Sequence, residues 1–174
     1  MSGTPATHVQ GVELSPDGRL VYVRTGQFGL GAHPDVLITV ALGSCVGVAL
    51  WDRLGHKGAL AHVMLPSPGV SDPGGDLNRF ASYAVPAMVA ELSGSRGISA
   101  LVAKVVGGAA MFSGDTLHAS IGARNVDEVR RQLGLLSIPI VAEDTGGCCA
   151  RTAALHLDTG TLSVRGYAFG TREL

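Results

Sequence analysis

The sequence has 174 residues, a length that suits a single domain with a full hydrophobic core. Hydrophobic residues make up 46% of it and charged residues only 16%, a balance that excludes a disordered chain. The formal charge of −1 and the 5% of aromatic residues exclude the basic, base-stacking surface of a nucleic-acid-binding protein.

The N-terminus does not show the charged and then apolar pattern of a secretory signal. No run of about 20 apolar residues is present, so we expect no insertion into a membrane. Three cysteines, of which Cys148 and Cys149 are adjacent, do not make a disulfide framework and fit a reducing compartment. These features together predict a cytoplasmic protein.

Residues 1–19 contain a turn signal and no long apolar run, and we expect a flexible N-terminal extension there. A single domain is expected over residues 20–170, beginning with a strand near residues 20–24. After a glycine-rich connection come two apolar runs, residues 39–51 and 58–65. Both are predicted to be short buried strands joined by a polar turn.

Cys45 in the first run and His62 in the second are predicted to meet across an antiparallel hairpin. Partners across such a hairpin have a constant sum of residue numbers, so Cys45 faces His62 if the turn centres between Arg53 and Leu54. Directly opposed Cβ atoms lie roughly 4.5–5.5 Å apart, which brings a thiol within reach of an imidazole. The spacing leaves the exact register open.

A thiol beside an imidazole is the pattern of a cysteine nucleophile with its general base. Gly43 and Ser44 leave room for an approach to Cys45, and backbone N–H groups at this bend are candidates to hold an oxyanion. Thr39 is the only polar residue in its strand, and its hydroxyl is a candidate to orient His62 as the third member of a triad. Taken singly, Cys45 and His62 are more often inert core residues, so the catalytic pair and plain packing both stay open.

Two helices are expected downstream. Asp76 is the expected N-cap of the first, whose apolar stripe runs from Phe80 to Leu92 and in which Pro86 should cause a kink or a break. Asn125, followed by a glutamate at the third helical position, is the expected N-cap of the second. Further strands are predicted over residues 98–106, 138–142, 152–157 and 161–167, with fraying at the C-terminal end.

Strands therefore outnumber helices, which predicts the α+β class. We expect a layered α/β sandwich in which two main helices cover mixed or largely antiparallel sheets.

Three further features favour structural over chemical roles. Gly107 and Gly108 lack the ending of a phosphate loop and are interpreted as a close-packed turn. Adjacent cysteines lack the reach of a Cys-x-x-Cys pair around zinc, so no metal site is expected at Cys148 and Cys149. The carboxylates of the turn at residues 143–147 are interpreted as solvated. We expect neither a metal nor an organic cofactor.

Several separated segments together resemble those of one known family. Leu42-Gly43-Ser44-Cys45-Val46 is similar to the family's nucleophile segment, and Ala61-His62-Val63-Met64-Leu65-Pro66 to its histidine segment. Residues 104–109, 121–125 and 143–147 resemble its downstream motifs. The resemblance covers roughly residues 36–165 in the family's order, and the family is CheD, the chemoreceptor glutamine deamidases.

The resemblance implies a layered α/β sandwich and a catalytic site of Cys45, His62 and Thr39. It implies a cysteine-dependent protein-glutamine glutaminase that hydrolyses glutamine side-chain amides of methyl-accepting chemoreceptors to glutamates, and in principle glutamyl methyl esters as well. The implied partners are the cytoplasmic region of a chemoreceptor and a CheC-type phosphatase.

Two alternatives remain open, a non-catalytic docking module for such a phosphatase or receptor and a Cys–His protease. An activated Cys45 would be expected to react with iodoacetamide well below the pH typical of a free thiol.

Overall fold

The computed structural model describes residues 7–9, 12–70, 72, 74–93, 97–110 and 116–174. Its elements follow one another along the chain as β1 (Thr7–Val9), β2 (Val12–Leu14), β3 (Leu20–Tyr22), β4 (Phe28–Ala32), β5 (Val36–Leu42), β6 (Val46–Asp52), β7 (Lys57–Val63), the 3-10 helix η1 (Leu77–Arg79), α1 (Ala81–Ser93), β8 (Leu101–Gly107), α2 (Thr116–Leu135), β9 (Ile140–Thr145), β10 (Arg151–His156), β11 (Leu162–Gly166) and β12 (Gly170–Glu173). None of the helices in these described ranges has the length and apolar character that crossing a bilayer requires.

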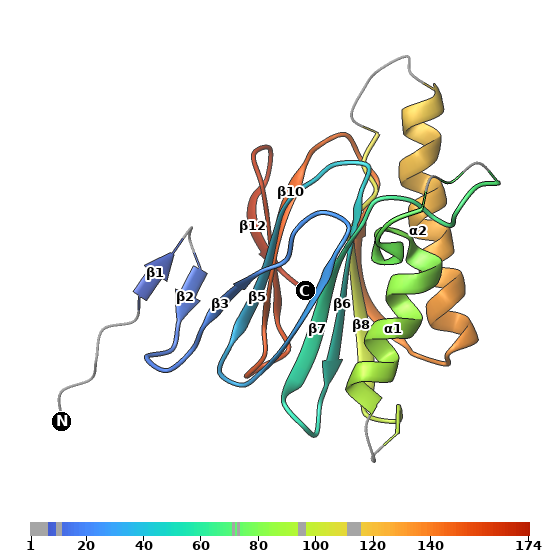
Figure 1. The fold of residues 1–174 in the computed structure, drawn as a ribbon. Coiled ribbons are helices and arrows are strands. Elements are labelled where there is room, and N and C mark those ends of the chain that lie inside the picture. The colour runs from blue at the N-terminus through green and yellow to red at the C-terminus, as the bar shows by residue number, and fades with distance from the viewer. Residues whose placement is uncertain (1–6, 10–11, 71, 73, 94–96, 111–115) are drawn as a thin grey trace, which may run out of the picture.

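Two five-stranded sheets pack face to face, and α1 and α2 cover the outer face of one of them (Figure 1). The uncovered sheet has the strand order β12-β11-β10-β5-β3, and the helix-covered sheet has the order β4-β7-β6-β8-β9. Each sheet is antiparallel except for one parallel pair, β3 with β5 in the first and β8 with β9 in the second. The predicted α+β sandwich with mixed sheets is confirmed.

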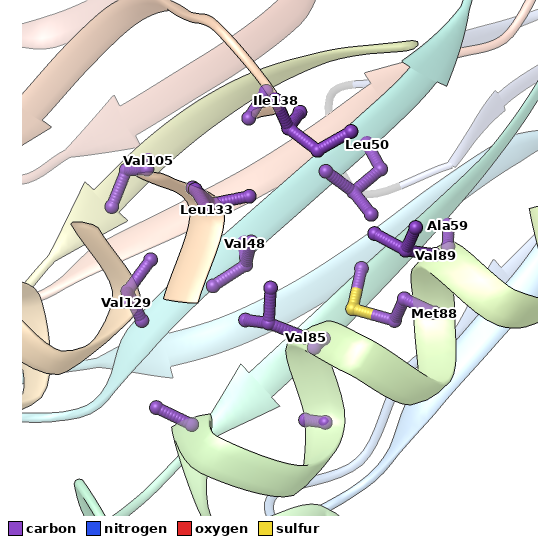
Figure 2. Close-up of a cluster of buried hydrophobic side chains, with 14 of the residues drawn as sticks. Val48, Leu50, Ala59, Val85, Met88, Val89, Val105, Val129, Leu133 and Ile138 are labelled. Atoms are coloured by element: carbon purple, nitrogen blue, oxygen red, sulfur yellow. The ribbon is translucent and has the colours of Figure 1, made fainter. Parts of the chain in front are cut away.

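The central strands β6 and β7 are buried on both faces, which explains why their sequences are continuously apolar rather than alternating. Figure 2 shows one face, where Val48 and Leu50 of β6 and Ala59 of β7 meet the helices through Val85, Met88, Val89, Val129 and Leu133. The alternate residues, such as Ala49 and Leu60, pack against Leu37, Leu155 and other residues of the second sheet. His62 has the parity of Leu60 and therefore belongs to the interface between the sheets.

The first helix differs from the prediction in one respect. Asp76 does cap a helical segment, because its Oδ1 accepts a hydrogen bond from the Asn78 backbone N–H (2.9 Å), but that segment is the short η1. Helix α1 then runs without interruption through Pro86, so the expected break is absent. A proline inside a helix removes one backbone hydrogen bond and disfavours the helix, but packing overrides this cost here, because Val85 and Met88 beside Pro86 are fully buried.

The second helix begins at Thr116, ten residues before the expected first helical residue, Val126, so the prediction of Asn125 as its N-cap is wrong. Asn125 lies inside α2 and is completely buried. Its side chain is engaged by other parts of the chain rather than by its own helix, as described below. The local sequence pattern of a cap was present, but tertiary contacts decide what this side chain does.

Both ends of the chain add short strands that the sequence did not predict. β12 pairs with β11 where fraying was expected. β1 pairs with β2 in a small hairpin, and Val12 and Leu14 of β2 are buried against Val36 and Ile38. The remaining residues of the expected N-terminal extension include 1–6 and 10–11, which lie outside the described part of the chain.

Candidate active site

The register of the β6–β7 hairpin places His62 opposite Gly47 rather than opposite Cys45. The turn is centred one residue later than expected, because Asp52 Oδ1 accepts hydrogen bonds from the backbone N–H groups of Leu54 (3.0 Å) and Gly55 (2.9 Å). Cys45 therefore lies just before β6, two residues from the partner of His62. The register, which the sequence left open, is thus two residues away from direct opposition of Cys45 and His62. Because Cys45 and Gly47 have the same parity, both lie on one face of the sheet.

Thr39 and His62 meet across the interface between the two sheets. The Thr39 Oγ1 and His62 Nδ1 atoms lie 2.8 Å apart, and both residues are almost completely buried. The Thr39 hydroxyl also donates to the Val23 carbonyl oxygen at 2.9 Å. A hydroxyl has one hydrogen, so toward His62 it accepts, and His62 Nδ1 must carry the proton. The tautomer is thereby set, and Nε2 is left with a free lone pair.

The end of β5 is strained where it leads into the segment that carries Cys45. Ala41 has a φ of 58°, in the left-handed region that costs a non-glycine residue about 1–2 kcal/mol. The Gly43 N–H bonds back to the Ala41 carbonyl oxygen at 3.0 Å, which makes a tight bend. The pairing of β5 with β10 shifts register at the same place. Such strain tends to gather at functional sites, so this bend marks residues 43–45 as a candidate site.

We call residues 43–45 the Cys45 loop. All three of its carbonyl groups accept hydrogen bonds from donors on the same side of the loop. Each carbonyl oxygen accepts one hydrogen bond, that of Gly43 from the Ala109 N–H (2.8 Å), that of Ser44 from Asn125 Nδ2 (3.0 Å) and that of Cys45 from the Gly108 N–H (2.8 Å). In a trans peptide the next N–H points opposite to the carbonyl, so the N–H groups of Ser44 and Cys45 point to the other side. Among the described residues, neither N–H donates to another backbone carbonyl. The loop thus presents two donors of the kind that hold an oxyanion.

Gly107 and Gly108 allow the close approach that these bonds require. Their φ angles are 110° and 67°, where other residues are strained. A Cβ at Gly107 would overlap the Cys45 carbonyl oxygen, and one at Gly108 would overlap the side chain of Val126. The close packing expected of this glycine pair is confirmed, although Gly107 is the last residue of β8 rather than part of a turn. The pair supports the Cys45 loop.

Burial keeps both Cys45 and His62 in their neutral forms at neutral pH. It lowers the pKa of His62 to about 4 and raises the pKa of the Cys45 thiol, an effect that the Cys45 backbone N–H partly offsets. The raised pKa of the Cys45 thiol argues against alkylation well below the pH of a free thiol in the free protein. At neutral pH, attack by this thiol therefore requires a base that takes its proton as the sulfur attacks.

The lowered pKa of His62 predicts a specific pH dependence of stability. Between pH 6.5 and about 4 the unfolded chain binds a proton at His62 that the folded chain does not. The neutral, buried His62 therefore contributes fully to the free energy of unfolding above pH 6.5. As the pH falls from 6.5 toward 4, the free energy of unfolding decreases by about 1.4 kcal/mol per pH unit, roughly 3 kcal/mol in total. His62→Gln should remove this part of the pH dependence.

Urea unfolding of the unmodified protein and of His62→Gln at pH 7, 6 and 5 measures the effect. The free energies of unfolding of the unmodified protein and of His62→Gln should converge or cross as the pH falls. Parallel curves would contradict the assignment of a buried, neutral His62.

Residues 143–151 are more structured than the sequence suggested. Glu143 pairs with Arg130 (Nε–Oε1, 3.0 Å) and Asp144 with the buried Arg151 (Nη2–Oδ1, 2.9 Å), so these carboxylates are paired rather than simply solvated.

The Sγ atoms of Cys148 and Cys149, further along the same segment, lie 3.7 Å apart. A cavity of about 420 Å³ beside this segment is lined by Ala41, Arg151, Arg165 and Tyr167, among others, and includes neither Cys45 nor His62.

The structure thus joins two of the predicted residues directly, Thr39 and His62, and places Cys45 on the adjoining loop. Sequence reasoning missed Asn125 as part of this arrangement. A helix-capping pattern gave a sufficient local explanation for it, and only the fold brings it to the Cys45 loop.

Comparisons with known proteins show which proteins this chain is similar to. Residues 64–166 match the family model described as CheD chemotactic sensory transduction. A protein of Moorella thermoacetica named "Probable chemoreceptor glutamine deamidase CheD" is 46% identical over 137 residues, which cover 76% of this chain and 81% of that protein. A Clostridium botulinum protein of the same name is 37% identical over 162 residues, which cover 91% of this chain and 99% of that protein. The family model begins two residues after His62, so it does not include Thr39, Cys45 or His62.

Proposed function

Because the chain belongs to the CheD family, we propose that it is a protein-glutamine deamidase that hydrolyses glutamine side chains of chemoreceptors to glutamate. The observation that carries the proposal is the hydrogen bond between Thr39 and His62, which leaves His62 Nε2 available as a base. His62 pairs with Gly47, two residues after Cys45. A chemoreceptor cytoplasmic region is the proposed substrate. The CheC-type phosphatase is a proposed regulatory partner, and a cytoplasmic location follows from the proposed substrate.

The first half-reaction forms a thioester on Cys45. Sγ attacks the side-chain amide carbon of the substrate glutamine while His62 Nε2 takes the thiol proton, since both groups are neutral beforehand. The oxyanion that develops accepts hydrogen bonds from the Ser44 and Cys45 N–H groups. The imidazolium then gives its proton to the departing nitrogen, and ammonia leaves as the carbonyl re-forms.

The second half-reaction releases glutamate. His62 Nε2 takes a proton from water, and the hydroxide equivalent attacks the thioester carbon. The same two N–H groups hold the second oxyanion. Collapse breaks the carbon–sulfur bond, and the thiolate leaving group regains its proton from the imidazolium. The net change is one water consumed and one ammonia released, without a cofactor.

Thr39 has a testable share in this scheme. Thr39→Val keeps the shape of the side chain but removes the oxygen that accepts from His62 Nδ1–H. The imidazole is then free to turn or to change tautomer, and we expect kcat to fall about 10- to 100-fold. Thr39→Ser keeps the hydroxyl and should retain most of the activity. Steady-state ammonia release measures both variants, and equal activity of Thr39→Val and the unmodified protein would contradict the role of the hydroxyl.

The function itself is tested by ammonia release from a purified chemoreceptor cytoplasmic fragment. A fragment with glutamines at its modification sites should yield ammonia, and the same fragment with glutamates there should not. Tight binding without ammonia would instead favour the docking module. A cleaved fragment would favour the protease. Methanol release from a methylated fragment would add the ester hydrolysis that the chemistry permits.

A further inference from the structure

Asn125 occupies a position in α2 that a leucine would suit better if only packing mattered. It is completely buried, and its neighbours along the same helix face, Val126 and Val129, belong to the apolar core. One turn earlier, Gly122 brings the helix backbone against the turn at Gly108, where a Cβ would lie 2.6 Å from the Gly108 carbonyl oxygen. The helix is therefore held close to the segment that supports the Cys45 loop.

Both hydrogens of the Asn125 amide are used, and they join two separate segments. Nδ2 donates to the Ser44 carbonyl oxygen at 3.0 Å and to the Met64 carbonyl oxygen at 2.9 Å. Ser44 directly precedes Cys45, and Met64 follows His62 by two residues. One side chain thus ties the Cys45 loop to the end of β7.

The remaining polar atom of Asn125, its Oδ1, is buried and has no hydrogen-bond partner in the part of the chain that the structure describes. A buried acceptor without a partner destabilises a fold, and each such group requires an explanation. The explanation here is that the two donated bonds, rather than the stability of α2, determine the residue at this position.

We infer that Asn125 is a positioning residue that sets where Cys45 lies relative to His62. It holds the Ser44 carbonyl, and because the peptide is planar it thereby directs the Cys45 N–H toward the proposed oxyanion. The inference rests on the proposed function for its catalytic consequence. The placement of Cys45 itself does not depend on that function.

Two variants remove the bonds in different ways. Asn125→Ala removes the whole amide, and Asn125→Leu removes both donors while filling the space. Val129→Ala, one turn further along the same buried face, is the matched control because it weakens packing without touching the two carbonyl groups. We expect a fall in kcat of about 10- to 100-fold in the Asn125 variants with little change in KM, since a small misplacement of reacting groups has this effect. Val129→Ala should keep its kcat.

A second measurement needs no substrate. The rate of iodoacetamide alkylation of Cys45, followed by peptide mass spectrometry with Cys148 and Cys149 as internal references, reports the position and burial of the thiol. It should rise several-fold in both Asn125 variants and stay unchanged in Val129→Ala. Even if neither the unmodified protein nor any variant shows deamidation, the alkylation rates alone test whether Asn125 determines the position of Cys45.

Three outcomes would overturn the inference. Unchanged Cys45 alkylation in both Asn125 variants would show that the loop holds itself. An equal effect of Val129→Ala would assign the change to general loosening of the fold. Failure of both Asn125 variants to fold would show that Asn125 serves the whole structure rather than the site.

Discussion

Cys45→Ala should abolish deamidation, with a loss on the order of 10⁴ to 10⁶ in kcat. The thiol is the only group on the Cys45 loop that can form the thioester, and alanine offers no nucleophile. Cys45 is only half-buried at the edge of the inter-sheet core, so the loss of one sulfur atom should lower the free energy of unfolding by about 1 kcal/mol. Ammonia release and urea unfolding measure the two effects separately.

Cys148→Ala is the matched control for this variant. It makes the same chemical change at an exposed cysteine and should leave kcat and stability as they are. Appreciable deamidation by Cys45→Ala, or an equal loss in Cys148→Ala, would contradict the assignment of the nucleophile. Cys45→Ala should still bind the receptor fragment, since the change removes a reacting group and no docking surface.

His62→Gln should lower kcat by about 10² to 10⁴-fold, because general-base catalysis contributes this much. Glutamine keeps an N–H donor that can reach Thr39 Oγ1, so the interface between the sheets is disturbed little. It has no basic nitrogen to take the thiol proton. Since burial raises the pKa of Cys45, the variant should recover activity only as the pH rises and ionises the thiol directly.

The pH profile provides the check on this variant. Deamidation by the unmodified protein should fall only as the pH approaches the His62 pKa of about 4. His62→Gln should instead show a rate that rises continuously with pH. Identical profiles for the two proteins would rule out His62 as the base.

The architecture was predictable because the central strands are buried on both faces. Continuous apolar runs flanked by polar turns identified β6 and β7, and the number of such runs indicated a sandwich covered by helices. Short edge strands carry no such signal. β12 is exposed along its whole length, so its sequence shows neither alternation nor an apolar run.

The candidate site was predictable in its residue types but not in its geometry. Thr39, Cys45 and His62 stood out as polar or reactive groups in apolar strands. The register followed from the two bonds that Asp52 makes in the turn, and periodicity does not reveal these. The His62 tautomer depends on the Val23 carbonyl, and the burial of Asn125 depends on how α2 packs, both of them contacts between distant parts of the chain.

Peptide mapping of a chemoreceptor fragment treated in H₂¹⁸O tests the central claim most directly. Hydrolysis through a thioester predicts that specific glutamines become glutamates that carry one ¹⁸O atom, in an intact backbone and only when Cys45 is present. Receptor glutamines that remain unchanged despite binding, or that convert equally well with Cys45→Ala, would contradict it.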